Sequence, residues 1–169
     1  MSLKILAEAE KILPKLLKDR TKWNSLCIDY EKPFINRLWI QHGDYRIYLH
    51  KIHKCTMEES FLHPHHWPNA MKIVKGSYAQ YMGKNSGNLP PAKESLVYNI
   101  QHEGSFYEMV DIDKWHKIVP ISDHVMSLMV TGKFWHRWTR PINKILKPLN
   151  EFEKDEIFNF FERIYLAKL

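Results

Sequence analysis

The sequence predicts a mainly β fold, an antiparallel barrel or jelly roll with a helix at each end. Short apolar and aromatic stretches at close spacing fill residues 34–140, as in small antiparallel barrels. Apolar residues at helical spacing mark both ends of the chain. The length of 169 residues, with 44 % hydrophobic and 13 % aromatic residues, is that of one domain with a substantial core. We therefore expect a single domain over 1–169, made of an N-terminal helical segment (1–33), the barrel (34–140) and a C-terminal helical segment (141–169).

The two terminal helices are predicted from periodicity and from start signals. Apolar residues recur at helical spacing over 3–19, and Pro14 should kink that helix or divide it in two. A second helix is expected over 150–168, where Asn150 and Glu153 have the spacing of a capping box. Its expected apolar face consists of Phe152, Phe160, Phe161 and Ile164.

The strands are predicted from short apolar runs between turn residues. Residues 34–53 form an expected hairpin around His42-Gly43-Asp44, and residues 70–82 an expected strand pair broken at Lys75-Gly76. Residues 83–94, rich in glycine, asparagine and proline, are an expected loop. Further strands are expected over about 95–101, 105–112, 115–121 and 125–132.

Composition limits the classes of function. The net charge of +6 and the pI of about 9.2 permit an acidic partner but do not require one. No apolar run approaches the roughly 18 residues of a membrane span, so no membrane role is expected. Cys27 and Cys55 are too few for a disulfide scaffold, and the expected setting is the reducing cytoplasm.

The stretch His63-Pro64-His65 is the strongest candidate for a functional site. Residues i and i+2 of a strand share a face, so His63 and His65 should point the same way as two metal ligands. Pro64 favours extended geometry for itself and for the residue before it. One more ligand would complete a site with open coordination positions, which is the arrangement that catalytic metals need.

The spacing around these histidines resembles the first motif of the cupin superfamily. The pattern consists of His63-x-His65, a ligand-type position at Asn69 and a glycine at Gly76. The resemblance covers about residues 34–135 and implies a small jelly roll with its metal inside the barrel. Cupins take a further histidine from a later strand, for which His116 is the natural candidate. Many cupins are dimers, so a homodimer is also implied.

Two differences from the usual pattern narrow the resemblance. Many cupins carry a glutamate where this chain has Asn69, and the missing carboxylate indicates a site of three histidines, His63, His65 and His116. That set is similar to the one used by the cysteine dioxygenase-like branch, and Arg37 lies where that branch places its arginine for the substrate carboxylate. The resemblance implies a mononuclear Fe(II) dioxygenase for a small anionic substrate, a thiol or a carboxylate. With zinc or nickel the same ligands would serve other reactions or a structural role. The usual proline and glycine before the last histidine are Asp111 and Asp113 here.

Several residues compete for roles in this site. Arg46, on the partner strand of the hairpin, competes with Arg37 as the group that binds the substrate anion. Tyr78 is taken as the catalytic donor of a proton or hydrogen bond, although the other strand tyrosines could serve or simply pack. His66 is a possible substitute ligand, but it should face the opposite side of the strand. Whether Asn69 joins the site is left open.

Two other classes of function are kept. In the first, a non-enzymatic cupin holds a small ligand, with His63 and His65 as hydrogen-bonded interior residues. In the second, residues 133–148 bind nucleic acid, because basic and aromatic residues alternate there without an acidic one. We favour a solvated connection for 133–148, with Trp135 and Trp138 covering the barrel mouth or packing against the last helix.

Overall fold

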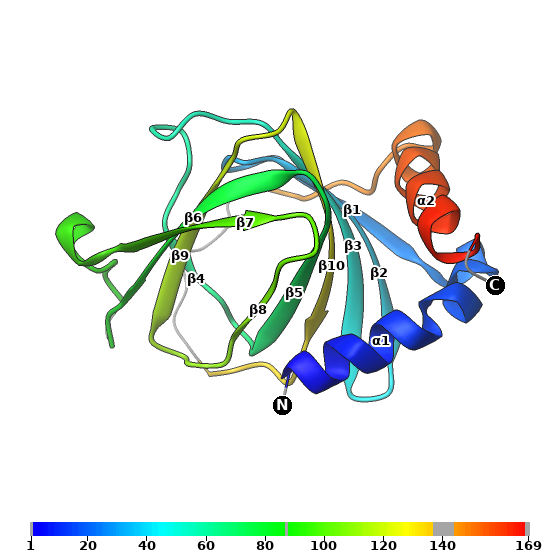
Figure 1. The fold of residues 1–169 in the computed structure, drawn as a ribbon, viewed down its shortest axis with the longest axis horizontal. Helices are drawn as coiled ribbons and strands as arrows, with labels where there is room; N and C mark the ends of the chain where they lie inside the picture. Colours follow the sequence, from blue (N-terminus) through cyan, green and yellow to red (C-terminus); the bar gives the residue numbers. More distant parts are fainter. Residues whose placement is uncertain (1, 87, 137–143, 168–169) are drawn as a thin grey trace.

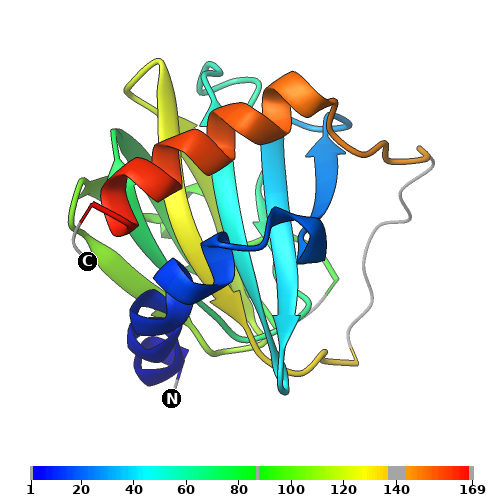
Figure 2. The same ribbon diagram turned by 90° about the vertical axis from the view of Figure 1, so that its right-hand side faces the viewer.

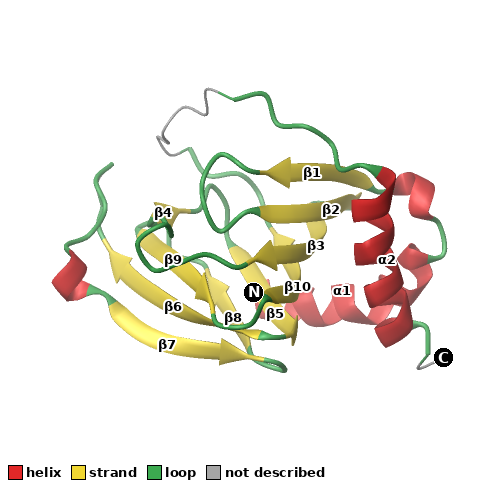
Figure 3. Cartoon of the chain, turned by 90° about the horizontal axis from the view of Figure 1, so that it is seen from above, coloured by secondary structure: helices red, strands yellow, loops and turns green. Residues whose placement is uncertain are grey.

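Two antiparallel sheets face each other, and two helices cover the outer face of the larger sheet (Figure 1). The computed structural model describes residues 2–86, 88–136 and 144–167. The six-stranded sheet has the order β1 (Asn24–Ile28), β2 (Ile35–His42), β3 (Tyr45–His53), β10 (His124–Thr131), β5 (Asn69–Lys75) and β8 (Phe106–Met109). The four-stranded sheet has the order β4 (His63–Pro64), β9 (Lys114–Pro120), β6 (Ser77–Lys84) and β7 (Val97–His102). The predicted jelly roll with terminal helices is confirmed, although the described strands form two sheets and not one closed barrel (Figure 3).

Alternation along the strands separates two hydrophobic clusters. On β3, Ile47 and Leu49 pack in the cluster that contains the helices, whereas Tyr48 and Ile52 pack between the two sheets. Successive side chains of a strand point to opposite faces, so one strand supplies both clusters. Polar side chains on the inner face therefore lie inside the jelly roll, which is where a site can be built.

The helices lie side by side over the outer face of the large sheet (Figure 2). Helix α1 (Ser2–Leu17) buries Leu13 and Leu17 on either side of Pro14. Of the two expected outcomes at Pro14, a kink or a division, the division is wrong, because α1 continues through Pro14 as one helix. The flanking leucines pack on the core shared with the sheet. Within the described residues, neither helix combines the length and the apolar character that crossing a bilayer requires.

Helix α2 (Glu151–Tyr165) begins with the predicted capping box, in which Asn150 and Glu153 exchange hydrogen bonds of 2.9 Å. Its predicted face is partly wrong, because Phe152 is 79 % exposed. The buried residues of α2 are Ile157, Phe158, Phe161 and Tyr165. Phe152 lies in the first turn, beyond the surface that α1 and the sheet cover.

The connection at Gly76 passes from one sheet to the other. The expected break at Lys75-Gly76 is present. The predicted strand pair implied that β5 and β6 pair with each other, but they belong to different sheets. Gly76 has a positive φ of 84°, and a Cβ there would lie 2.7 Å from the carbonyl oxygen of His124. The chain can change sheets at this point because only glycine tolerates both conditions.

The N-terminal segment contains a strand as well as a helix. Within 1–33, which we expected to be helical, β1 pairs with β2, and Cys27 lies opposite Asn36. The Cys27 amide donates to the Lys147 carbonyl over 2.8 Å, which ties the strand to the segment before α2. The five residues of β1 are too few for a clear alternating pattern in the sequence. This strand is therefore recognised only from its pairing with β2. Short one-turn 3₁₀ helices lie at Arg20–Lys22 and Lys93–Ser95.

Candidate metal centre

Strand pairing brings the three predicted histidines together. His63 on β4 lies directly opposite His116 on β9, and His65 follows one residue beyond β4. One ring nitrogen from each histidine can be chosen so that all three lie within 4.8 Å of one another. The Nε2 atoms of His65 and His116 are 2.9 Å apart. These histidines converge on one point inside the jelly roll.

The donor set fits a divalent transition metal. A metal held at about 2.1 Å by two imidazoles at a right angle places their nitrogens about 3 Å apart. The separation of the His65 and His116 nitrogens agrees with that geometry. Imidazole suits iron, zinc, nickel and copper, so the set does not select among them.

Neighbouring groups hold the outer nitrogens of two rings. The Nδ1 atom of His116 is 3.1 Å from the side-chain nitrogen of Gln80, and Nδ1 of His63 is 3.4 Å from the Phe61 carbonyl oxygen. Gln101 in turn donates to the Gln80 side-chain oxygen over 3.2 Å. The amide nitrogen of Gln80 donates to Nδ1 of His116, so Nε2 of that ring carries the proton and donates it to His65. To bind a metal through Nε2, His116 needs an acceptor at Nδ1, which the Gln80 side-chain oxygen provides when the amide turns over.

Burial keeps the imidazoles neutral. It lowers the pKa of His63 to about 4 and the pKa values of His65 and His116 well below 6.5. The other histidines of the cluster lower the pKa values of His65 and His116 further, since two adjacent imidazolium ions repel each other. Neutral imidazole is the form that binds a metal.

Arg37 lies on the inner face, close to these histidines. Its guanidinium stacks 5.1 Å from the Tyr48 ring centroid, and burial lowers its pKa. Its positive charge contributes to the lowered pKa of His65 and of His50, its partner across the hairpin. Arg37 Nε and His50 Nε2 are buried without a hydrogen-bond partner among the described residues. A guanidinium N–H and a neighbouring imidazole nitrogen, both buried and without a partner, are suited to an incoming anion.

Tyr78 lies one step away from the histidines. It is fully buried, and its hydroxyl is 2.7 Å from that of Tyr107 and 3.4 Å from Met71 Sδ. Burial raises the pKa of Tyr107 to about 12 and that of Tyr78 well above 10. The side chain of Gln80 also interacts with Tyr107. Tyr78 thus connects to the histidine cluster through Tyr107 and Gln80, and its catalytic role stays a prediction.

His66 lies outside the three-histidine cluster, and Arg46 and Asn69 make contacts of their own. His66 stacks on Phe134 with ring centroids 5.2 Å apart, away from the other histidines, as alternation predicts. Arg46 is exposed and stacks 4.8 Å from the Trp39 ring centroid. Asn69 is buried, and its side chain donates to the Trp67 carbonyl over 3.5 Å.

The basic segment 133–148 is described only in part. Trp135 donates its amide to the His66 carbonyl over 2.6 Å, and Lys144 pairs with Asp29 at 2.7 Å. Trp138, with Arg137 and Arg140, lies outside the described residues. The binding role of this segment stays a prediction.

Sequence reasoning missed His50, Gln80 and Tyr107. A two-residue loop after His42 fixes the hairpin register, which places His50 opposite Arg37, so this pair could have been found. Alternation from Tyr78 likewise places Gln80 on the inner face. Tyr107 required the pairing of β8 with β5, for which the sequence holds no short-range signal.

Comparison with known proteins supports the fold alone. No family model and no curated protein matches the chain. Among solved structures, ferrous HppE in complex with substrate matches with a TM-score of 0.52 and 8 % identity, covering 67 % of this chain and 58 % of that one. Hydroxypropylphosphonic acid epoxidase from S. wedmorenis matches with a TM-score of 0.49 and 8 % identity, covering 63 % and 55 %. The chain thus spans just over half the length of these neighbours.

Proposed function

We propose that the protein is a mononuclear metal enzyme, a non-haem Fe(II) dioxygenase that acts on a small anionic substrate bearing a thiol or carboxylate. The observation that carries this proposal is the convergence of three neutral imidazoles beside a buried arginine. His63, His65 and His116 would hold the metal and leave other positions open to substrate and dioxygen. When bound, the metal would supply dioxygen activation.

The protein's own residues would bind and orient the substrate. Arg37 would attract the substrate anion, and its Nε would donate to it together with the Nε2 of His50. Neutral imidazoles add no negative charge, so the site stays attractive to an anion. Tyr107, with Tyr78 behind it, would fix the position of Gln80 and therefore of His116.

Iron is the metal that the proposal favours. The solved neighbour with the TM-score of 0.52 is ferrous HppE in complex with substrate, which is compatible with iron in a fold of this kind. Zinc and nickel are the alternatives that three histidines also accept, so the choice of metal is itself part of the proposal.

Metal analysis tests the ligand set. The purified protein should contain close to one equivalent of metal after loading with Fe(II) without oxygen. The double variant His63→Ala/His116→Ala should contain no bound metal. His102 is an exposed histidine at the end of β7, and His102→Ala should keep the full metal content. Full metal content in the double variant would exclude the proposed ligands. Dioxygen uptake with small thiol carboxylates would then test the reaction, and Arg37→Gln should raise KM about tenfold or more.

A non-enzymatic ligand-binding protein is the second candidate. The 2.9 Å contact between His65 and His116 is also an ordinary hydrogen-bond distance, so the cluster can exist without metal. A protein that binds small acids but takes up no metal would favour this candidate. A homodimer and a cytoplasmic setting stay predictions.

A further inference from the structure

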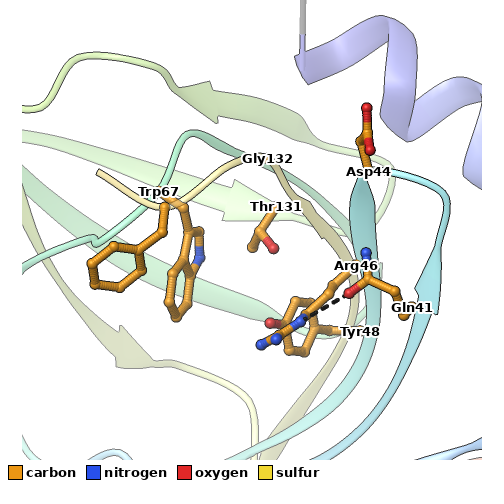
Figure 4. Close-up of a pocket in the computed structure, with 8 residues that line it drawn as sticks. Gln41, Asp44, Arg46, Tyr48, Trp67, Thr131 and Gly132 are labelled. Atoms are coloured by element: carbon orange, nitrogen blue, oxygen red, sulfur yellow. Dashed lines mark hydrogen bonds between the residues drawn. The ribbon is translucent and has the colours of Figure 1, made fainter. Parts of the chain in front are cut away.

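A pocket at one end of the sandwich has no role in the proposed metal centre. It has a volume of about 180 Å³. Its lining residues are Gln41, Asp44, Arg46, Tyr48, Trp67, Thr131, Gly132 and Phe134. Trp67 lies on one side, and Arg46 and Tyr48 lie on the other (Figure 4). We call it the mouth pocket.

The mouth pocket has the size and wall of a site for one aromatic ring. A cavity of roughly 150 Å³ is enough to admit benzene. Trp67 and Phe134, with ring centroids 6.0 Å apart, form an aromatic wall, and Phe134 also stacks on His66. Aromatic surfaces of this kind bind flat rings by stacking and by edge contacts.

The polar groups of the pocket favour an anion. Arg46 is held by Trp39 and donates through Nε to the Gln41 side-chain oxygen over 3.2 Å, and no carboxylate pairs with it among the described residues. The indole Nε1 of Trp67 is buried and has no hydrogen-bond partner in the described part of the chain. A buried donor without a partner is costly, so a ligand acceptor would stabilise it. Asp44, exposed at the hairpin turn, is the one acidic group of the lining.

The pocket adjoins the interior site through Tyr48. The Tyr48 ring lines the pocket and also stacks with Arg37, and its centroid is 5.7 Å from that of His50. Trp67 follows His65 by two residues.

We infer that the mouth pocket binds a single aromatic ring that carries an anionic group, as in an aryl carboxylate. The ring packs on Trp67 and Phe134, and the anion faces Arg46. The inference goes beyond the proposed function and does not depend on it, because that function assigns the substrate anion to Arg37 and not to Arg46. Binding itself does not require metal.

Calorimetry on metal-free protein tests the inference with phenylacetate as the probe. We expect saturable binding that Arg46→Gln weakens roughly tenfold, because a charged hydrogen bond is lost. Trp67→Phe, which keeps a ring but removes the N–H, should weaken it less than Trp67→Ala. Arg163→Gln, an exposed charge on α2, is the matched control and should leave binding unchanged.

Three results would overturn the inference. These are no binding of phenylacetate, binding that neither Arg46→Gln nor Trp67→Ala weakens, and equal or tighter binding of hexanoate or benzylamine. Hexanoate lacks the ring, and benzylamine would instead pair with Asp44. His63→Ala separates this inference from the proposed function, since it should remove metal and leave phenylacetate binding intact. If the wild-type protein takes up no metal, the proposed function fails. The calorimetry still shows whether the mouth pocket binds phenylacetate.

Discussion

His116 illustrates how individual residues make this site. It is 3 % exposed, and its two ring nitrogens face different partners, Gln80 on one side and His65 on the other. Gln80 is fully buried and is itself held by Gln101. The orientation of the His116 ring, a proposed metal ligand, therefore depends on the side-chain amides of Gln80 and Gln101.

Replacing Gln80 tests this dependence. Gln80→Leu keeps the volume but removes the amide oxygen that would accept a hydrogen bond from Nδ1 of His116 in the metal-bound protein, and we expect metal affinity to fall roughly 10- to 100-fold. Competition with a chromophoric chelator measures the change. Gln41→Leu, at the hairpin on the surface, is the matched control. Equal affinity in the wild-type protein and in Gln80→Leu would show that Gln80 does not position the ligand.

His50 should make the stability of the metal-free protein depend on pH. Burial, with Arg37 and His65 nearby, holds its folded pKa well below 6.5. The unfolded chain therefore takes up a proton first as the pH falls. The stabilising contribution of neutral His50 is complete above about pH 6.5 and is lost as the pH falls towards the folded pKa.

His50→Gln removes this contribution to the pH dependence. Between about pH 7 and pH 5, the fall in unfolding free energy should be smaller than in the wild-type protein by about 2 kcal/mol. Urea denaturation at several pH values measures it. His102→Gln should follow the wild-type curve, and identical curves for His50→Gln and wild type would contradict the argument.

Among the secondary-structure elements, the connection from β5 to β6 at Gly76 and the short strand β4 determine where the histidines meet. Strand β4 has only two residues, and its pairing with β9 is what sets His63 against His116. β9 also pairs with β6, the strand that begins just after Gly76. The turn at Gly76 thus determines the position of the strand that supports the centre.

Two glycine substitutions separate backbone strain from close packing. Gly76 and Gly104 both have positive φ, of 84° and 86°, but a Cβ would meet a backbone oxygen at 2.7 Å at Gly76 and nothing within 4 Å at Gly104. We expect Gly104→Ala to cost about 1 kcal/mol and Gly76→Ala about 2–4 kcal/mol. Chemical denaturation gives both values, and equal costs would show that His124 does not restrict this turn.

At the scale of the whole molecule, polar contacts tie the helices to the sheet and to each other. Glu10 on α1 pairs with Lys72 on β5 and accepts a hydrogen bond of 3.0 Å from Tyr165 on α2. Burial and the nearby Glu10 carboxylate raise the pKa of Tyr165, which keeps its hydroxyl protonated. One carboxylate therefore joins three elements that are distant in the sequence.

A double-mutant cycle tests this link. Glu10→Gln and Tyr165→Phe should each destabilise the protein, with a coupling of about 0.5–1.5 kcal/mol between them. Thermal or urea unfolding measures the four proteins. Glu8→Gln, exposed on the same helix, combined with Tyr165→Phe should show additive effects. Additivity in the Glu10 cycle would mean that the observed contact does not stabilise the fold.

The sequence alone determined the elements whose signals are local. Periods of two and of about 3.6 residues, the turn at Gly43 and the capping box at Asn150 predict the hairpin, most strands and both helices. They also place His63 and His65 on one face of an extended segment. These features depend on residues that lie close together in the sequence.

Which strands are neighbours follows from the three-dimensional packing of the chain and not from its local patterns. The edge strand β1, the exposure of Phe152 and the assignment of β5 and β6 to different sheets all depend on contacts between distant segments. The same contacts bring Arg37, His50 and Gln80 to the three histidines. Pairing between strands far apart in the chain depends on how the whole core packs, and short-range patterns do not record it.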